Sequence, residues 1–259
     1  MRPLGTVTGA AVLIIASTAC LGGRGPSLDP VASPVIGEPV VYVAIGASEM
    51  AGVGTDEPFR QAWPKVLWRD ALPEAVFYDL GRPGSTLAEA LVEQAGEAAA
   101  LRPDLVTVWL NVNDLVEQVP ATAYEADLRQ LLTMLDDSTD AAVLVASTPR
   151  IDSLPLYLAC RPDPPLDSQP CPALGVSLPS PSHVRAAVER YNAAIGRVAA
   201  EVGAIVVDLE AFGDAPAEHP EWIAADGFHP SAEGAIAIAS AFAEAVPARI
   251  VAAAAAAPQ

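Results

Sequence analysis

The 259-residue sequence predicts one α/β domain, a three-layer doubly wound sandwich built on a five-stranded parallel sheet of the flavodoxin-like type. Two observations support this fold. Five short runs of mainly apolar, often β-branched residues suit strands buried on both faces, and helical patterns alternate with them. Right-handed crossovers then place helices on both sides of the sheet. The predicted strands cover residues 40–45, 75–80, 105–110, 142–146 and 204–209.

Capping signals indicate where the first helices begin. Thr86 with Glu89 has the pattern of a capping box, and the helix that it opens should end before Pro103. Thr122 with Glu125 has the same pattern, ahead of a leucine-rich apolar stripe. We therefore expect two helices with side-chain caps between the second and fourth strands.

The C-terminal half contains two further predicted helices and one long irregular segment. Residues 182–202 form one helix, and Ser231 caps the last. Residues 149–181 break the alternation, because they are rich in proline and carry the last two cysteines. A loop this long is usually functional or disordered.

The first 19 residues predict a signal peptide for export. Arg2 supplies the positive charge, and residues 10–16 form an apolar stretch too short to span a bilayer. The segment 17–20, which reads Ser-Thr-Ala-Cys, resembles a bacterial lipobox, although Ser17 stands where Leu is usual. That resemblance implies cleavage before Cys20 and lipid attachment to its thiol. The alternative is a plain secretory signal in which Cys20 is incidental.

The remaining chain divides into three parts. Residues 20–39 are rich in Gly, Pro and Ser and predict a flexible tether. Residues 40–250 form the predicted folded domain, and residues 251–259 form an Ala-rich tail. We expect an exported protein, either a cell-envelope lipoprotein or a secreted one, that meets a membrane only through its lipid anchor.

The three cysteines fit this compartment. If Cys20 is lipidated, Cys160 and Cys171 remain as an even pair in an oxidising environment, where a disulfide is the simple expectation. Two free thiols are the alternative. The chain has only three histidines and none adjoins this pair, which argues against a zinc site there.

The charge balance limits the classes of partner. The chain carries 32 acidic and 14 basic residues, a formal net charge of −18, without a basic patch. This composition argues against nucleic-acid binding and gives no electrostatic attraction to anionic lipids.

A serine and a histidine from opposite ends of the chain are candidates for one active site. Ser48 follows the first predicted strand, and His229 lies just before the last predicted helix. Asp226 precedes His229 by three residues in a turn that contains Gly and Pro, so its carboxylate can hold one imidazole nitrogen while the other accepts a serine proton. The non-catalytic alternatives are a turn or capping role for Ser48 and a surface role for His229.

Two further loops after strands carry groups that suit an oxyanion site. Asn113 follows the third strand and can donate a side-chain hydrogen bond, and Gly84 follows the second strand, where backbone N–H groups can approach a ligand. Turn geometry and helix capping are the alternative roles. The carboxyl ends of parallel strands meet at one edge of the sheet, which is where such folds collect their active groups.

Taken together, these motifs resemble those of the GDSL or SGNH hydrolase family, over residues 40 to about 246. The resemblance implies that Ser48 is the nucleophile, that Asp226 and His229 complete the triad, and that Gly84 and Asn113 join the Ser48 backbone N–H in the oxyanion hole. The four matching blocks occur in family order and cover residues 46–48, 82–86, 111–114 and 226–230.

The sequence departs from the family pattern at two positions. Ala47 stands where Asp is usual, and Asn111 stands where Gly is usual. Neither change removes a triad or oxyanion group. Ala47 affects support of the serine loop, and Asn111 adds bulk near the oxyanion donors, so Asn111 is also a candidate substrate contact.

The resemblance implies a serine esterase that acts through an acyl-enzyme and needs no metal or organic cofactor. We expect a small-molecule or glycan ester with a short acyl or acetyl group. The 149–181 segment would line one side of the cleft, with Tyr157 as a candidate substrate contact. The alternatives are a non-catalytic envelope lipoprotein that binds ligands in the same cleft, an acyltransferase with the same triad, and a metal site formed by Asp114, Asp226 and His229.

Overall fold

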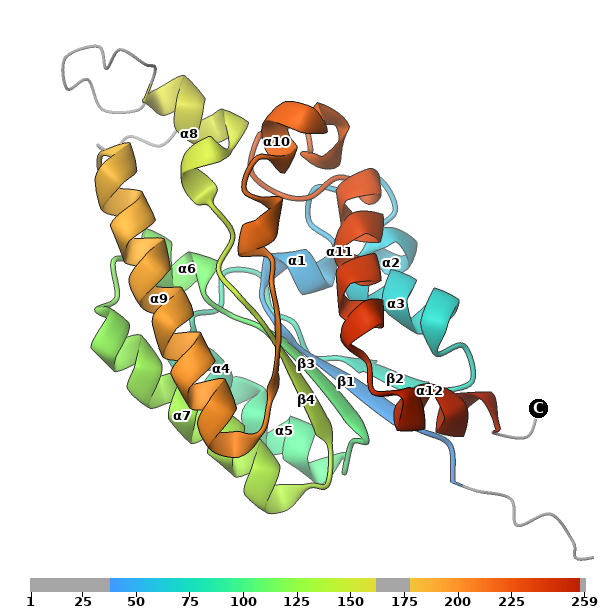
Figure 1. The fold of residues 1–259 in the computed structure, drawn as a ribbon. Coiled ribbons are helices and arrows are strands. Elements are labelled where there is room, and N and C mark those ends of the chain that lie inside the picture. The colour runs from blue at the N-terminus through green and yellow to red at the C-terminus, as the bar shows by residue number, and fades with distance from the viewer. Residues whose placement is uncertain (1–37, 162–177, 257–259) are drawn as a thin grey trace, which may run out of the picture. The chain divides into compact units, whose positions relative to one another are not determined.

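A computed structural model describes residues 38–161 and 178–256, which form a five-stranded parallel sheet between two layers of helices (Figure 1). The strand order is β2-β1-β3-β4-β5, and every neighbouring pair is parallel. The predicted fold class is therefore confirmed. The strands are β1 (Val41–Gly46), β2 (Val76–Asp79), β3 (Leu105–Trp109), β4 (Ala142–Ala146) and β5 (Ile205–Val207).

Helices cover both faces of this sheet. Together, α4, α5, α7 and α9 lie on one face, while α3, α11 and α12 lie on the other (Figure 1). Their bounds are α1 (Ser48–Ala51), α2 (Pro58–Gln61), α3 (Trp63–Ala71), α4 (Leu87–Glu93), α5 (Ala95–Ala100), α6 (Val112–Val116), α7 (Ala121–Ser138), α8 (Pro155–Cys160), α9 (Pro181–Val202), α10 (Ala215–Glu218), α11 (Ala232–Ala245) and α12 (Ala248–Ala255).

Each helical layer packs on the sheet through its own hydrophobic core. On the α3 and α11 side, the Trp63 ring stacks on Phe242 with centroids 4.1 Å apart. On the α7 and α9 side, Tyr124 stacks on Tyr191 at 4.3 Å. Successive side chains of a strand pack alternately into these two cores, since strands β1, β3 and β4 are buried on both faces.

The capping predictions were partly correct. Thr86 and Glu89 form the capping box at the start of α4, and the Ser231 hydroxyl accepts a hydrogen bond from the Gly234 N–H at the start of α11. The second predicted box is wrong, because α7 begins directly after Pro120 and has no side-chain cap. Thr122 is therefore already inside the first turn, where its hydroxyl is not in the N-cap position.

The C-terminal segment is part of the fold for most of its length. Helix α12 extends to Ala255, and Ile250 and Ala254 are buried against the α3 and α11 side of the sheet. The segment assigned to an Ala-rich tail thus begins as a packed helix. Among the described residues, no single helix is long and apolar enough to cross a membrane; α11 and α12 pass that test only as a pair, which is bent by 101°.

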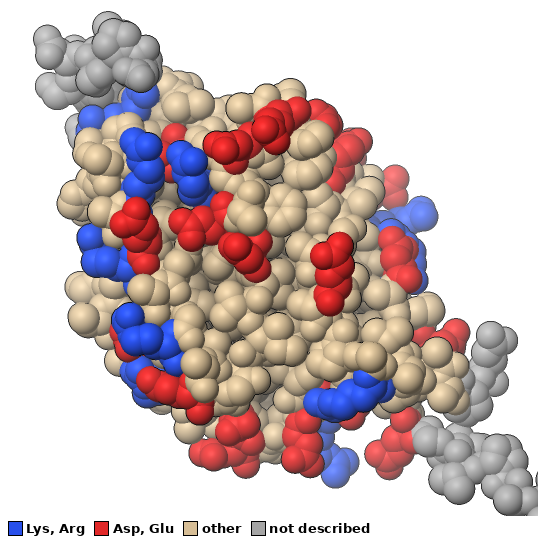
Figure 2. Space-filling view, viewed as in Figure 1, with Lys and Arg blue, Asp and Glu red and all other residues tan. Residues whose placement is uncertain are grey.

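Several sequence predictions lie outside the described residues. These are the signal peptide, the proposed lipidation of Cys20, nearly all of the tether, and Cys171 as the disulfide partner of Cys160. On the face shown in Figure 2, acidic side chains are interspersed with small groups of Lys and Arg.

Candidate active site

The candidate nucleophile lies where strand β1, an inner strand of the sheet, turns into a short helix. β1 ends at Gly46, and Ser48 is the first residue of α1. The turn is tightly packed, because a Cβ at position 46 would lie 2.3 Å from the Met50 Cγ and 3.0 Å from the Trp109 carbonyl oxygen. Only glycine fits there, and Ser48 is thereby presented at the carboxyl edge of the sheet.

Ser48 is connected to the C-terminal loop by a chain of hydrogen bonds. The Ser48 Oγ lies 3.0 Å from the His229 Nε2, although 181 residues separate the two in sequence. The His229 Nδ1 lies 2.6 Å from the Asp226 Oδ2. In this arrangement the imidazole can take the serine proton while the carboxylate orients the ring and stabilises its charged form.

The Asp226 carboxylate also holds its own turn together. Its Oδ1 accepts hydrogen bonds from the backbone N–H groups of Phe228, at 2.8 Å, and His229, at 2.9 Å. Partial burial alone would raise the pKa of Asp226, but the hydrogen bonds from the His229 side chain and these two N–H groups outweigh it and lower the pKa. Asp226 is therefore held in its charged form.

Two glycines let neighbouring segments pack closely against the histidine loop, which carries Asp226 and His229. Gly227 has a φ of +73°, its carbonyl accepts a hydrogen bond from the Leu156 N–H at 3.0 Å, and a Cβ there would lie 2.9 Å from the Leu156 nitrogen. Gly54, which follows α1, has a φ of +96°, and a Cβ there would lie 2.8 Å from the His229 Cβ. Close backbone approach on both sides thus fixes His229.

The two loops proposed to supply oxyanion donors are joined to each other. The Asn113 Nδ2 donates a hydrogen bond to the Ser85 carbonyl at 2.9 Å, which uses one of its two amide hydrogens. Gly84, next to Ser85, is exposed and has a φ of +87°, and nothing lies within 4 Å of a Cβ built there. The glycine at this position therefore serves the turn rather than close packing.

A buried glutamine that sequence reasoning missed ties the serine loop to the Gly84 loop. Gln94, at the end of α4, accepts a hydrogen bond from the Gly46 N–H and donates one to the Gly46 carbonyl, both at 3.0 Å. Its amide also lies 3.3 Å from the Ser85 Oγ. This bridge supports the serine loop, where Ala47 offers no polar side chain of its own. A lone glutamine within a helical segment gives no sequence signal for such a role.

Asp114 has a structural role beside the candidate oxyanion group. Its carboxylate accepts the Leu87 N–H at the start of α4, at 3.0 Å and 3.3 Å from its two oxygens. Burial raises the pKa of Asp114 to about 6, against the opposing effect of that hydrogen bond. Among the residues that the structure describes, no group of three or more His, Cys, Asp or Glu is placed to hold a metal ion.

The two residues predicted as substrate contacts lie in other surroundings. Asn111 is buried, accepts a hydrogen bond from the Trp109 Nε1 and donates one to the Ala146 carbonyl, both at 3.2 Å. Tyr157 packs in a separate hydrophobic cluster with Val184, and its hydroxyl donates to the Pro179 carbonyl at 2.6 Å. Neither side chain lines the cavity beside His229.

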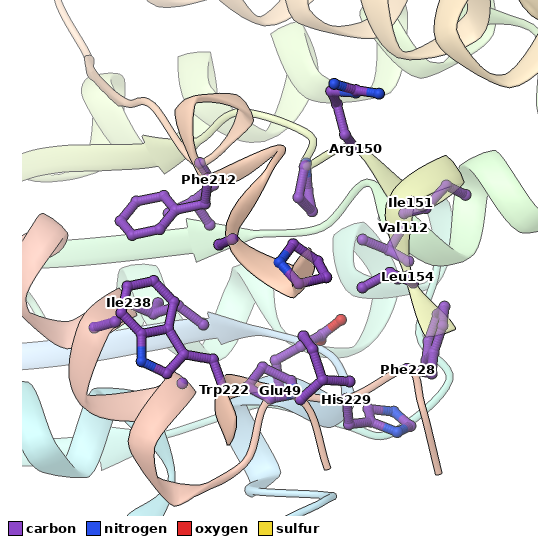
Figure 3. Close-up of a pocket in the computed structure, with 18 of the residues that line it drawn as sticks. Glu49, Val112, Arg150, Ile151, Leu154, Phe212, Trp222, Phe228, His229 and Ile238 are labelled. Atoms are coloured by element: carbon purple, nitrogen blue, oxygen red, sulfur yellow. The ribbon is translucent and has the colours of Figure 1, made fainter. Parts of the chain in front are cut away.

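That cavity has a volume of about 100 Å³ and mainly apolar walls (Figure 3). Trp222, Phe212 and Ile238 line it, and so do Glu49 and His229. Glu49 follows Ser48 directly in the sequence, and His229 is hydrogen-bonded to Ser48. Glu49 was not singled out from the sequence. Its position directly after the candidate nucleophile was the one signal available.

A protein-family model matches most of this chain. The model of the GDSL-like Lipase/Acylhydrolase family matches residues 44–236. No curated protein matches the chain in a sequence search.

Solved structures that resemble this fold include several esterases. A lipase/acylhydrolase from Enterococcus faecalis superposes with a TM-score of 0.59 at 20% identity, covering 81% of this chain and 96% of that one. The acetylxylan esterase Axe2 from Geobacillus stearothermophilus has a TM-score of 0.57 at 20% identity, with 81% and 94% coverage. The psychrotrophic esterase EstA from Pseudoalteromonas sp., solved with monoethylphosphonate as inhibitor, has a TM-score of 0.59 at 14% identity, with 80% and 96% coverage.

Proposed function

The chain belongs to the GDSL-like lipase/acylhydrolase family, and from this premise we propose that it is a serine esterase with Ser48 as nucleophile. The family and its esterase neighbours support ester hydrolysis in general. The observation that carries the finer proposal is the hydrogen-bonded chain from Ser48 through His229 to Asp226.

In the proposed acylation, the His229 Nε2 takes the proton from the Ser48 Oγ as this oxygen attacks the ester carbonyl carbon. Negative charge then develops on the carbonyl oxygen. The backbone N–H groups of Ser48 and Gly84 and the side-chain amide of Asn113 stabilise it. The tetrahedral intermediate collapses, the bond to the alcohol oxygen breaks, and His229 gives its proton to the departing alcohol.

Deacylation repeats this chemistry with water. His229 takes a proton from the water molecule as its oxygen attacks the acyl-enzyme, and then returns that proton to the Ser48 Oγ as the carboxylic acid leaves. Asp226, held charged by its hydrogen bonds, stabilises the imidazolium in both steps.

We further propose a short acyl group, acetyl or butyryl, on a small-molecule or glycan alcohol. The name of Axe2, an acetylxylan esterase of similar fold, supports this proposal.

The variant Ser48→Ala tests the nucleophile. Hydrolysis of p-nitrophenyl acetate should be lost while the thermal unfolding midpoint stays close to that of the wild type. Ser138→Ala, an exposed position on α7, is the matched control and should keep full activity. Undiminished turnover by Ser48→Ala would refute the assignment. An added alcohol that diverts the acyl group into a new ester would instead identify an acyltransferase.

Export and lipid anchoring are proposed on the N-terminal sequence pattern, which ends at Cys20. Metabolic labelling with palmitate in a bacterial host tests the anchor. The wild type should incorporate label and partition with membranes, whereas Cys20→Ala should not; label that persists in Cys20→Ala would refute it.

A further inference from the structure

The cavity beside His229 contains one polar group that the proposed mechanism does not use. The Glu49 side chain reaches into it from α1, between Trp222 and His229 (Figure 3). The walls around it are almost entirely apolar and aromatic. Arg150, the other charged residue at the cavity, is already engaged by Asp152, with both nitrogen–oxygen distances at 3.3 Å.

Glu49 is buried, and one of its two carboxyl oxygens has no hydrogen-bond partner among the described residues. The residue is 8% exposed, and the oxygen without a partner is Oε2. Burial raises the pKa of Glu49, against smaller lowering effects from its own backbone N–H and from His229. A buried polar oxygen without a hydrogen bond costs stability. Among the described residues no hydrogen bond offsets that cost at Oε2, so this oxygen can accept a hydrogen bond from a ligand in the cavity that the residue lines.

The position of the cavity indicates which part of the ester would meet Glu49. His229 lines the cavity, whereas the proposed oxyanion donors Gly84 and Asn113 do not. In the proposed reaction His229 protonates the departing alcohol, so the alcohol part of the substrate must lie beside its imidazole. In the same proposed reaction the carbonyl oxygen meets the oxyanion donors, which do not line the cavity.

We propose that Glu49 determines alcohol specificity by hydrogen bonding a hydroxyl group of the alcohol part of the ester, so that the enzyme prefers esters of polyols or sugars. The inference rests on the esterase function proposed above. A carboxyl oxygen accepts a hydrogen bond in either protonation state, and a hydroxyl group of the alcohol can donate one, which gives a matched pair. The aromatic walls suit the carbon skeleton of such an alcohol, because ligand pockets combine apolar walls with a few orienting polar groups.

The test compares two acetate esters that differ in whether the alcohol part can donate hydrogen bonds. Glycerol monoacetate carries free hydroxyls beside the ester, and its di-O-methyl derivative does not. We expect the wild type to favour glycerol monoacetate by roughly tenfold in kcat/KM, the size expected for one good hydrogen bond. The ratio of the two kcat/KM values is the readout, because damage to the shared acylation machinery cancels in it.

Two variants separate recognition from general damage. Glu49→Leu should reduce the preference to about one, and Glu49→Gln, which keeps a donor and an acceptor, should retain most of it. A wild-type ratio near one, or an unchanged ratio in Glu49→Leu, would overturn the assignment. A cationic ligand is the competing chemistry: a Glu49-dependent preference for acetylcholine over 3,3-dimethylbutyl acetate, exceeding the hydroxyl preference, would also overturn it.

The outcomes distinguish this inference from the function on which it rests. If the wild type hydrolyses neither glycerol ester nor p-nitrophenyl acetate, the esterase proposal itself fails, and the inference fails with it. If the wild type hydrolyses these esters and Glu49→Leu leaves the ratio of kcat/KM values unchanged, the inference alone fails.

Discussion

Replacing Gly54 with alanine should disable the site from a position that takes no part in the chemistry. Gly54 has a φ of +96°, which L-residues rarely adopt, and lies against the histidine loop. A Cβ at position 54 would be 2.7 Å from the Pro230 carbonyl oxygen and 2.8 Å from the His229 Cβ. Gly54→Ala therefore adds both backbone strain and a collision with the proposed general base.

The structure sets the size of the effect. An ordinary carbon contact begins at 3.4 Å, so the His229 Cβ must move by about 0.6 Å relative to position 54. The Ser48–His229 hydrogen bond is 3.0 Å long, and lengthening it by the same amount would bring it to about 3.6 Å, beyond hydrogen-bonding range. A misplacement of this order costs about 10²-fold in rate, and the left-handed backbone costs about 1–2 kcal/mol of stability.

The assay pairs Gly54→Ala with Gly203→Ala. Gly203 ends α9 with a φ of +73°, and nothing lies within 4 Å of a Cβ there, so this control has the strain without the collision. Urea unfolding should show a loss of stability in both variants, and a larger one in Gly54→Ala because of the collision. Hydrolysis of p-nitrophenyl acetate should fall about 100-fold only in Gly54→Ala. Equal activity of the two variants would refute the reasoning.

Three further predictions follow from single contacts. Asp226→Asn should lower kcat for p-nitrophenyl acetate by about 10³–10⁴-fold, because it removes the carboxylate that orients His229; a loss below tenfold would contradict this. Asn113→Ala should cost about 10²–10³-fold in kcat if its amide holds the oxyanion, and unchanged kcat would exclude that role. Asp114 has a pKa of about 6, above its usual 3.8, so the folded state binds this proton more tightly than the unfolded state does. Ionisation of Asp114 should therefore lower the free energy of unfolding by up to about 3 kcal/mol as the pH rises from about 4 to about 6. Urea unfolding at pH 4 and pH 7 should show this loss of stability in the wild type and not in Asp114→Asn, which keeps an acceptor for the Leu87 N–H. An identical pH dependence of stability in the two proteins would refute the prediction.

Much of the fold could be predicted because buried parallel strands have a strong local signal. The run at 142–146 coincides with β4, β1 is shifted by one residue from its predicted range, and β3 ends one residue earlier than predicted. The last strand was predicted too long, since β5 ends at Val207 and the chain turns into a short 3-10 helix at Glu210–Phe212. Strand ends depend on hydrogen bonds to neighbours, which local sequence does not encode.

The candidate site was predictable where its parts lie in short motifs and unpredictable where they depend on packing. Ser48, Asp226 and His229 could be found from their positions around strand ends and turns. Gln94 and Glu49 could not, because their roles come from burial beside Gly46 and beside the cavity. Asn111 and Tyr157 were expected at the substrate, yet hydrogen bonds within the fold engage both.

Labelling with a fluorophosphonate, followed by peptide mapping, tests the central claim most directly. The reagent forms a stable adduct only with an activated serine, so its site of attachment reports the nucleophile itself. We expect one adduct, on the peptide that contains Ser48, and a strongly reduced labelling rate in His229→Ala, since the His229 Nε2 lies 3.0 Å from the Ser48 Oγ. An unlabelled wild-type protein, or an adduct on any serine other than Ser48, would contradict the account.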